Sequence, residues 1–354
     1  MIDFILTMAL SSVFALEFTD MDGTDAKKST AKKVETGEYY QPDPNAVKAV
    51  DDFDTLTSDE FVEKYYESLR SRYPDYIRRK NIGKDDSGLY DMWCYEFVPE
   101  NYKKTIYIQA GIHGRNEFES YYGTGIMMNL IADASDSEDP HLKNLRDNVR
   151  FIVVPIVNVY DVTERANAKK GVTSRTTYSP RNSNNINLNR DWIETPKSQE
   201  IRNIKSLLAQ YDYSTISFAF DEHTDPEGIP GWGGYLLSYA DGMPDFINNR
   251  LLDVNNYLYD KNITGQGISL IKAFMGCKSD YPASSAEWRN RTDDNTYKKS
   301  TDNWKSCSLG FYRDLGIYSS TIEHGARKFG AAGSQIEMLR AVELYVNHVY
   351  VQVE

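Results

Sequence analysis

The chain has 354 residues, and 40% of them are hydrophobic, which is enough for one large buried core or two small ones. Its formal net charge of -12 gives a surface that repels phosphate backbones, so we expect no nucleic acid among its partners. The cysteines Cys94, Cys277 and Cys307 form no closely spaced pair, which argues against a thiolate zinc site and a disulfide scaffold. The possibility of one disulfide between Cys277 and Cys307 stays open.

The chain begins with an apolar segment, residues 1–18, interrupted by Asp3 and Glu17 and too short for a stable membrane span. The small residue Ala15 suits a signal-peptide cleavage site, but no Lys or Arg precedes the apolar run. Two interpretations of this segment remain open. It is either a cleaved signal, which implies a secreted or extracytoplasmic protein, or an apolar segment that packs on the body of a cytoplasmic protein. Residues 19–51 predict a polar linker, and residues 52–354 one catalytic domain.

Strand and helix signals alternate along this domain, after a helical pattern that begins at Ser58. Strands are predicted at residues 92–98, 105–110, 149–158, 216–220, 235–239 and 317–322. Helices are predicted at residues 118–134, 196–211, 243–262 and 335–349. Apolar strands separated by helices predict the α/β class, with a mixed, mostly parallel central β-sheet covered by helices on both faces.

Metal-binding residue types follow three of the predicted strands, at the edge where such sheets bind ligands. A glycine turn after residues 105–110 leads to His113 and Glu117, and the strands that follow lead to His223 and Glu323. Two imidazoles and one carboxylate suit one Zn²⁺ ion with an open fourth position, beside which a further carboxylate takes a proton from water. One histidine at a strand end is commonly an ordinary core residue, so the joint pattern carries the prediction.

An asparagine-rich segment with two arginines, Arg181 and Arg190, lies between these strands. The planar fork of arginine matches a carboxylate, and asparagine adds a neutral donor. Alone, the segment is typical of a turn-rich loop with solvated arginines. Its place between metal-site strands favours a clamp for a substrate carboxylate.

Taken together, these residues resemble the zinc metallocarboxypeptidases of the carboxypeptidase A/B type. Over about residues 60–354 the chain carries the segments GIHGRNE, NLNRDW, DEHT and TIEHG in the order of that family. The resemblance implies that His113, Glu117 and His223 bind one zinc ion and that Glu323 is the general base.

The same resemblance implies roles in substrate binding. Asn189 and Arg190 correspond to the pair that binds the terminal carboxylate, and Tyr297 falls near the mobile tyrosine of the family. Arg181 corresponds to the arginine that stabilises the oxyanion. The alternatives for that arginine are Arg175 and Arg165.

The chain departs from the family pattern at several positions. Three residues, instead of the usual two, separate His113 from Glu117, which leaves Glu119 as an alternative ligand. The usual Asn-Pro-Asp-Gly after the second strand is replaced by residues 158–161, Asn-Val-Tyr-Asp, and His324 directly follows the general base.

The function that these features favour is zinc-dependent hydrolysis of the C-terminal peptide bond of peptides. Two alternatives stay open: a zinc-dependent N-acyl amino acid deacylase of the aspartoacylase or succinylglutamate desuccinylase type, and a non-catalytic binding module on the same fold. The expected substrate is a peptide, or a small acyl-amino acid, with a free carboxylate. Lysines in the predicted specificity segment, about residues 288–309, favour acidic side chains, as in peptidoglycan stem peptides.

Overall fold

The computed structural model describes residues 37–53, 55–173, 181–224, 250, 254, 257, 306–322 and 333–353, and the backbone alone of residues 234–238 and 323–324. The chain separates into two compact units, residues 1–40 and residues 41–354, and every element below belongs to the second unit. The predicted apolar segment 1–18 lies outside the described residues. None of the helices among the described residues has the length and apolar character that a membrane crossing requires.

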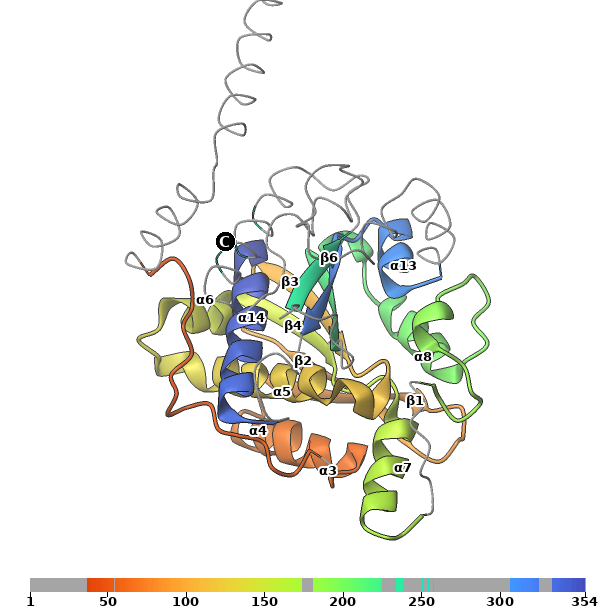
Figure 1. Ribbon diagram of the computed structural model, residues 1–354. Helices are drawn as coiled ribbons and strands as arrows, with labels where there is room; N and C mark the ends of the chain where they lie inside the picture. The colour runs from red at the N-terminus through yellow and green to blue at the C-terminus, as the bar shows by residue number, and fades with distance from the viewer. Residues whose placement is uncertain are drawn as a thin grey trace, which may run out of the picture. The chain divides into compact units, whose positions relative to one another are not determined.

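In the described part of the chain, seven strands form one sheet in the order β1-β2-β4-β3-β5-β7-β6 (Figure 1). The central strands β4, β3, β5 and β7 are parallel, whereas the pairs β1–β2, β2–β4 and β6–β7 are antiparallel. The strands are β1 (Ile77–Lys84), β2 (Asp91–Phe97), β3 (Lys104–Ala110), β4 (Val149–Val154), β5 (Phe218–Thr224), β6 (Gly234–Ser238) and β7 (Ser319–His324). The predicted α/β class with a mixed, mostly parallel sheet is confirmed.

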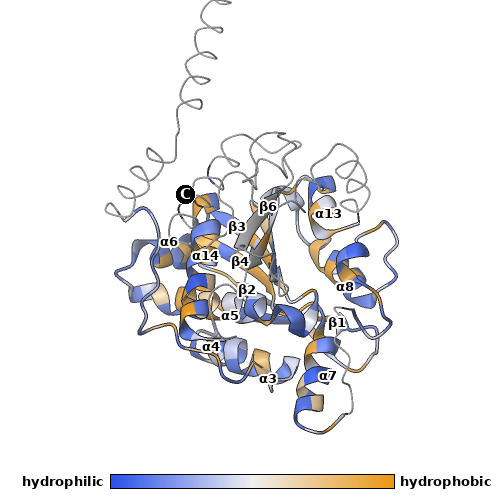
Figure 2. Cartoon of the chain, in the orientation of Figure 1, coloured by the Kyte–Doolittle hydropathy of each residue, from blue (hydrophilic) through white to orange (hydrophobic). Residues whose placement is uncertain are grey.

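Helices cover the sheet on both sides, with α5, α6 and α14 on one side and α8 and α13 on the other (Figure 1). Figure 2 shows largely hydrophobic strands between these layers, while α6 and α8 are hydrophobic on one side and hydrophilic on the other. Such two-sided helices bury the apolar stripe against the sheet. The helices are α3 (Ser58–Val62), α4 (Ser68–Arg72), α5 (Phe118–Ala132), α6 (Pro140–Asn148), α7 (Val159–Lys169), α8 (Gln199–Leu208), α13 (Ser308–Asp314) and α14 (Gln335–Val353), and a π-helical segment, Glu63–Glu67, joins α3 to α4.

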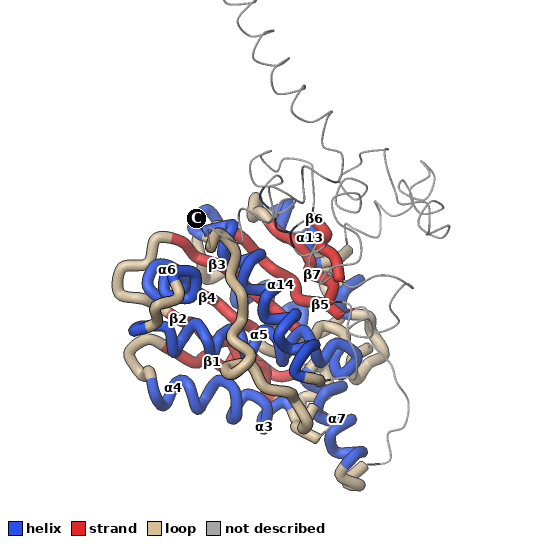
Figure 3. Tube along the Cα trace, turned by 60° about the vertical axis from the view of Figure 1, so that its left-hand side comes forward, coloured by secondary structure: helices blue, strands red, loops and turns tan. Residues whose placement is uncertain are grey.

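The helices α5 and α14 lie side by side over the sheet (Figure 3). Gly123 of α5 permits this close approach, because a Cβ atom there would fall 2.5 Å from the Tyr345 ring of α14. The polypeptide before α3 also packs against the start of α14, where the Val50 N–H donates to the Gly333 carbonyl at 2.7 Å. The C-terminal helix is therefore held from two sides.

Several elements differ from the sequence expectation. The strands β5 and β7 continue through polar residues to Thr224 and His324. The predicted site residues His223 and Glu323 therefore lie at the ends of these strands rather than after them. The strand β1 and the helices α6 and α7 were not predicted. The predicted helix 243–262 lies almost entirely outside the described residues.

Two buried glutamates, Glu200 of α8 and Glu337 of α14, lie outside the metal-site strands. Each is 0% exposed. Glu200 accepts a hydrogen bond from Asn182 Nδ2 at 3.0 Å, and Glu337 accepts one from the Gly333 N–H at 2.6 Å. Burial raises the pKa of each carboxyl from its ordinary value of 4.5 to about 7. The folded chain therefore retains protons that the unfolded chain has already released.

Replacing Glu200 or Glu337 by glutamine is expected to reduce the loss of folding stability as the pH rises from about 5 to about 8. Each carboxyl has a higher pKa when folded, so its contribution to stability declines between pH 4.5 and about 7. The decline is at most on the order of 2–3 kcal/mol for each group. Urea unfolding of the wild type and both variants at the two pH values measures it. The exposed-site control Glu138→Gln should keep the wild-type decline, and an equal decline in all four proteins would contradict the assignment.

Candidate metal centre

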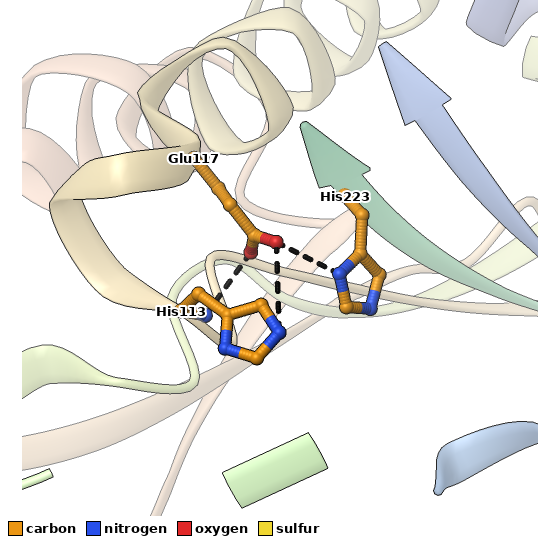
Figure 4. Close-up of side chains that lie close together, drawn as sticks. All are labelled: His113, Glu117 and His223. Carbon is orange, nitrogen blue, oxygen red and sulfur yellow. Dashed lines mark hydrogen bonds and ion pairs between the residues drawn. The ribbon is translucent and has the colours of Figure 1, made fainter. Parts of the chain in front are cut away.

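Three side chains from two distant parts of the chain meet at one point (Figure 4). The ligand atoms of His113, Glu117 and His223 all lie within 4.8 Å of one another. His223 Nδ1 is 2.8 Å from Glu117 Oε1, and His113 Nε2 is 4.0 Å from the same oxygen. Glu117 and His223 are buried, while the His113 side chain keeps 20% of its exposure. The structure therefore brings together the three residues that the sequence predicts as metal ligands.

The turn after β3 delivers two of these side chains. Gly111 and Gly114 adopt φ values of +64° and +63°, which favour glycine, and reverse the chain directly after the strand. A short 3₁₀ helix, Gly114–Glu117, follows His113 and leads into α5. Glu117 is the last residue of this helix, and its Oε2 accepts the His113 N–H at 3.0 Å. The spacing of three intervening residues is thus accommodated.

Asp161 of α7 supports this turn from behind. The fully buried Asp161 carboxylate accepts the Arg115 N–H at 3.0 Å and pairs with Arg165 Nε at 2.9 Å. A Cβ atom on Gly114 would fall 2.6 Å from Asp161 Oδ2, so only glycine fits at that position. Asn158 begins α7, its side chain accepting the Asp161 N–H, and its own N–H donates to the Gly111 carbonyl at 3.1 Å. The segment 158–161, which departs from the family pattern in sequence, therefore still supports the turn.

A second carboxylate lies behind His223. Asp221 Oδ2 is 3.1 Å from His223 Nε2 and also accepts the hydroxyl hydrogen of Ser308 from α13. Burial works against the charge of Asp221, yet His223 and Ser308 hold the pKa of this carboxyl below its ordinary value. A carboxylate on the far nitrogen of a histidine orients the ring so that its other nitrogen faces a metal. Nothing in the sequence besides the spacing Asp-x-His indicated this partner.

The two neighbouring glutamates have different surroundings. Glu119 lies in the first turn of α5 and is not part of the group of three, so the structure brings Glu117 rather than Glu119 next to both histidines. Burial, together with the nearby Glu337, raises the pKa of Glu119 well above its ordinary value. Glu222 alternates with His223 along β5, and burial likewise raises the pKa of its carboxyl.

The predicted general base, Glu323, is located by its backbone. It lies in β7 and is level with His223 in the parallel register between β5 and β7. The strand pairing therefore brings the TIEHG segment beside the DEHT segment. The side chain of Glu323 is outside the described residues, so its role as general base stays a prediction.

The predicted substrate-binding residues lie on the loop before α8. Arg181 is exposed and donates to the Asn185 carbonyl at 3.0 Å, and Arg190 donates to the Asn189 carbonyl at 2.6 Å. Within the described part of the chain, no hydrogen bond or ion pair joins either guanidinium to the three clustered residues. The buried Oδ1 atom of Asn189 has no hydrogen-bond partner among the described residues.

The remaining predicted residues divide into two sets. Arg165, an alternative for the oxyanion arginine, pairs with Asp161 and keeps only 10% of its side-chain exposure. Tyr297, Arg175 and Cys277 lie outside the described residues, as does most of the predicted specificity segment.

Comparison with known proteins agrees with this geometry. Residues 62–215 match the family model described as zinc carboxypeptidase. The resemblance to the zinc carboxypeptidases is confirmed. No curated protein matches the chain. The matched residues include His113, Glu117 and the Asn189–Arg190 pair, whereas His223 and Glu323 lie beyond the match.

Solved structures show the same fold. A metallo-carboxypeptidase from Burkholderia cenocepacia has a TM-score of 0.57 at 17% identity, over 84% of this chain and 69% of that one. Bovine thrombin-activatable fibrinolysis inhibitor has a TM-score of 0.55 at 15% identity, over 85% of this chain and 97% of that one. A metallo-carboxypeptidase from Pseudomonas aeruginosa has a TM-score of 0.51 at 14% identity, over 85% of this chain and 70% of that one. At these identities the likeness shows the fold alone.

The three clustered residues fit the metal of this family. Two ring nitrogens and a carboxylate oxygen are typical of a zinc site that keeps one position open. The carboxylate of Asp221 behind His223 supplies the outer support that metal-binding histidines commonly have.

Replacing Gly114 by alanine is expected to weaken zinc binding by about 10-fold or more, because the new Cβ displaces the Asp161 carboxylate that holds the ligand turn. Competition with a chromogenic chelator measures the zinc Kd. The matched control is Gly171→Ala, since Gly171 has a similar φ of +75° but open space where its Cβ would lie. Equal zinc affinities in the two variants would show that Asp161 does not support the turn.

Proposed function

We propose that this chain is a zinc-dependent carboxypeptidase that hydrolyses the C-terminal peptide bond of peptides. The observation that carries the proposal is the convergence of His113, Glu117 and His223 within 4.8 Å on a fold shared with metallo-carboxypeptidases. The match of residues 62–215 to the zinc carboxypeptidase family supports peptides as the substrate class.

The proposed chemistry places one proton acceptor beside the metal ligands. A zinc ion held by the three residues would polarise the scissile carbonyl and acidify a water molecule. Glu323 takes the proton from that water and delivers it to the departing amine nitrogen. The register of Glu323 with His223 supports this assignment, because it brings base and ligand to the same level of the sheet.

The loop before α8 binds the end of the substrate in this proposal. Asn189 and Arg190 hold the terminal carboxylate, which sets the distance from the chain end to the bond that is cut. Arg181 neutralises the oxyanion that develops on the carbonyl. The exposure of both guanidinium groups and the unpartnered Oδ1 of Asn189 support a loop that is open to a ligand.

Two further parts of the proposal, the substrate selectivity and the location of the protein, rest on the sequence. Lys298, Lys299 and Lys305 favour peptides that end in acidic side chains, such as peptidoglycan stems. The apolar segment 1–18 favours an extracytoplasmic site of action.

Replacing Glu323 by glutamine is expected to lower kcat by about 10²–10⁴-fold while leaving zinc bound, because only the proton acceptor is lost. Metal analysis should give about one zinc for each chain in the wild type and in this variant, and much less in His223→Ala. Full activity in Glu323→Gln would sink the assignment of the base. Absence of zinc from an active wild type would sink the metal assignment.

Amidation of the peptide C-terminus is expected to lower kcat/KM by about 100-fold or more, since Asn189 and Arg190 lose the carboxylate that they bind. Parallel assays of free and amidated forms of one peptide, with and without a chelator, measure this preference. Arg190→Ala should lower activity on the free form and leave the amidated form unchanged. Equal rates on both peptides would exclude an exopeptidase.

A further inference from the structure

The loop that carries the proposed substrate-binding residues is organised around one buried asparagine, Asn182, which is 3% exposed. Its Oδ1 accepts the N–H groups of Asn184 at 3.1 Å and Ile186 at 2.9 Å. Its main-chain N–H donates to the Ile186 carbonyl at 3.1 Å, and its carbonyl accepts the Asn185 N–H at 3.0 Å. Asn185 adopts a φ of +61°, which asparagine tolerates better than most residues. Asn182 thus closes a tight turn on itself.

The same side chain ties this turn to the body of the protein. Asn182 Nδ2 donates to Asp86 Oδ2 at 2.6 Å and to Glu200 Oε2 at 3.0 Å. Asp86 belongs to the connection between β1 and β2, and its other oxygen accepts the Gln199 N–H at the start of α8. The amide carries two hydrogens, one for each carboxyl group, so no other uncharged side chain of this size satisfies both acceptors.

The loop segment on either side of this anchor contains the proposed binding groups. Arg181 precedes Asn182 directly, and its guanidinium donates to the carbonyl of Asn185 within the turn. At the far end, the buried Asp191 accepts the Ser198 N–H at 2.7 Å and the Lys197 N–H at 3.1 Å. Asn189 and Arg190 therefore lie on a segment that is fixed at two points, of which Asn182 is the first.

We propose that Asn182 is a positioning residue for substrate binding, which holds Arg181 and the Asn189–Arg190 pair in place by joining their loop to Asp86 and Glu200. The inference rests on the proposed function of those residues. Asn182 itself makes no contact with the substrate in this proposal. Its effect reaches the substrate through the loop.

The central test is Asn182→Asp, which keeps the Oδ1 acceptor for the turn but loses the Nδ2 donor and adds a third carboxyl beside Asp86 and Glu200. We expect KM for a peptide with a free C-terminus to rise by about 10-fold or more, and the preference for free over amidated peptide to fall, with zinc content unchanged. The double variant Asn182→Asp with Glu200→Gln exchanges donor and acceptor between the two side chains. Its KM should therefore fall part of the way back toward the wild-type value.

The matched control is Asn129→Asp. Asn129 Nδ2 also donates two hydrogen bonds, to the carbonyls of Tyr65 at 2.9 Å and Gly125 at 2.7 Å, but it lies toward the end of α5 away from the ligand turn. It should lower stability and leave KM unchanged. If Asn182→Asp does not fold, Asn182→Ala removes the same two bonds without added charge and should raise KM similarly.

The outcomes separate the two proposals. An active wild type whose KM is unaffected by either Asn182 variant would overturn the positioning role alone, as would an equal KM change in Asn129→Asp. A wild type that binds zinc but hydrolyses no peptide would overturn the proposed function and this role with it. Recovery in the double variant supports the bond between positions 182 and 200.

Discussion

The contact between Glu117 and His223 is the interaction on which the site depends. It joins the first turn after β3 to the end of β5 through a buried pair of atoms 2.8 Å apart. Neither residue alone differs from an ordinary buried polar group. Because both are almost fully enclosed, their polar atoms need partners in the interior, and a metal ion satisfies such a set as well as a hydrogen bond does. The parallel pairing of β3 with β5 fixes where the two residues meet.

Around this contact, two carboxylates outside the group of three hold its residues in place. Asp161 holds the backbone of the turn, and Asp221 holds the ring of His223. Both are fully buried and charged groups, which is costly unless each is paired. Arg165 and the Arg115 N–H satisfy Asp161, while His223 and Ser308 satisfy Asp221. The three clustered residues are thus held in place largely by ion pairs and hydrogen bonds to buried carboxylates.

The apolar strands could be predicted from the sequence because burial leaves a direct trace in residue type. The grouping of His113, Glu117 and His223 could be predicted because these residues follow two such strands. The ends of β5 and β7 could not, since Asp221 to Thr224 have the composition of a loop and become strand only through pairing with their neighbours. The strand β1, rich in Arg and Lys and mostly exposed, shows no apolar alternation and was missed for that reason. Asp161 and Asn182 were given no role, because their partners are backbone groups and side chains that only the folded chain brings near.

The separation of the ligands along the chain also sets an order of assembly. His113 and Glu117 come from one turn, but His223 lies 106 positions beyond Glu117. Between them the chain builds α5, α6, β4, α7 and α8 before β5 can align with β3. A long crossover of this kind is slow to close, because its entropy is lost before its contacts form. A metal ion bound by all three residues would therefore find its complete site only after β5 has paired with β3.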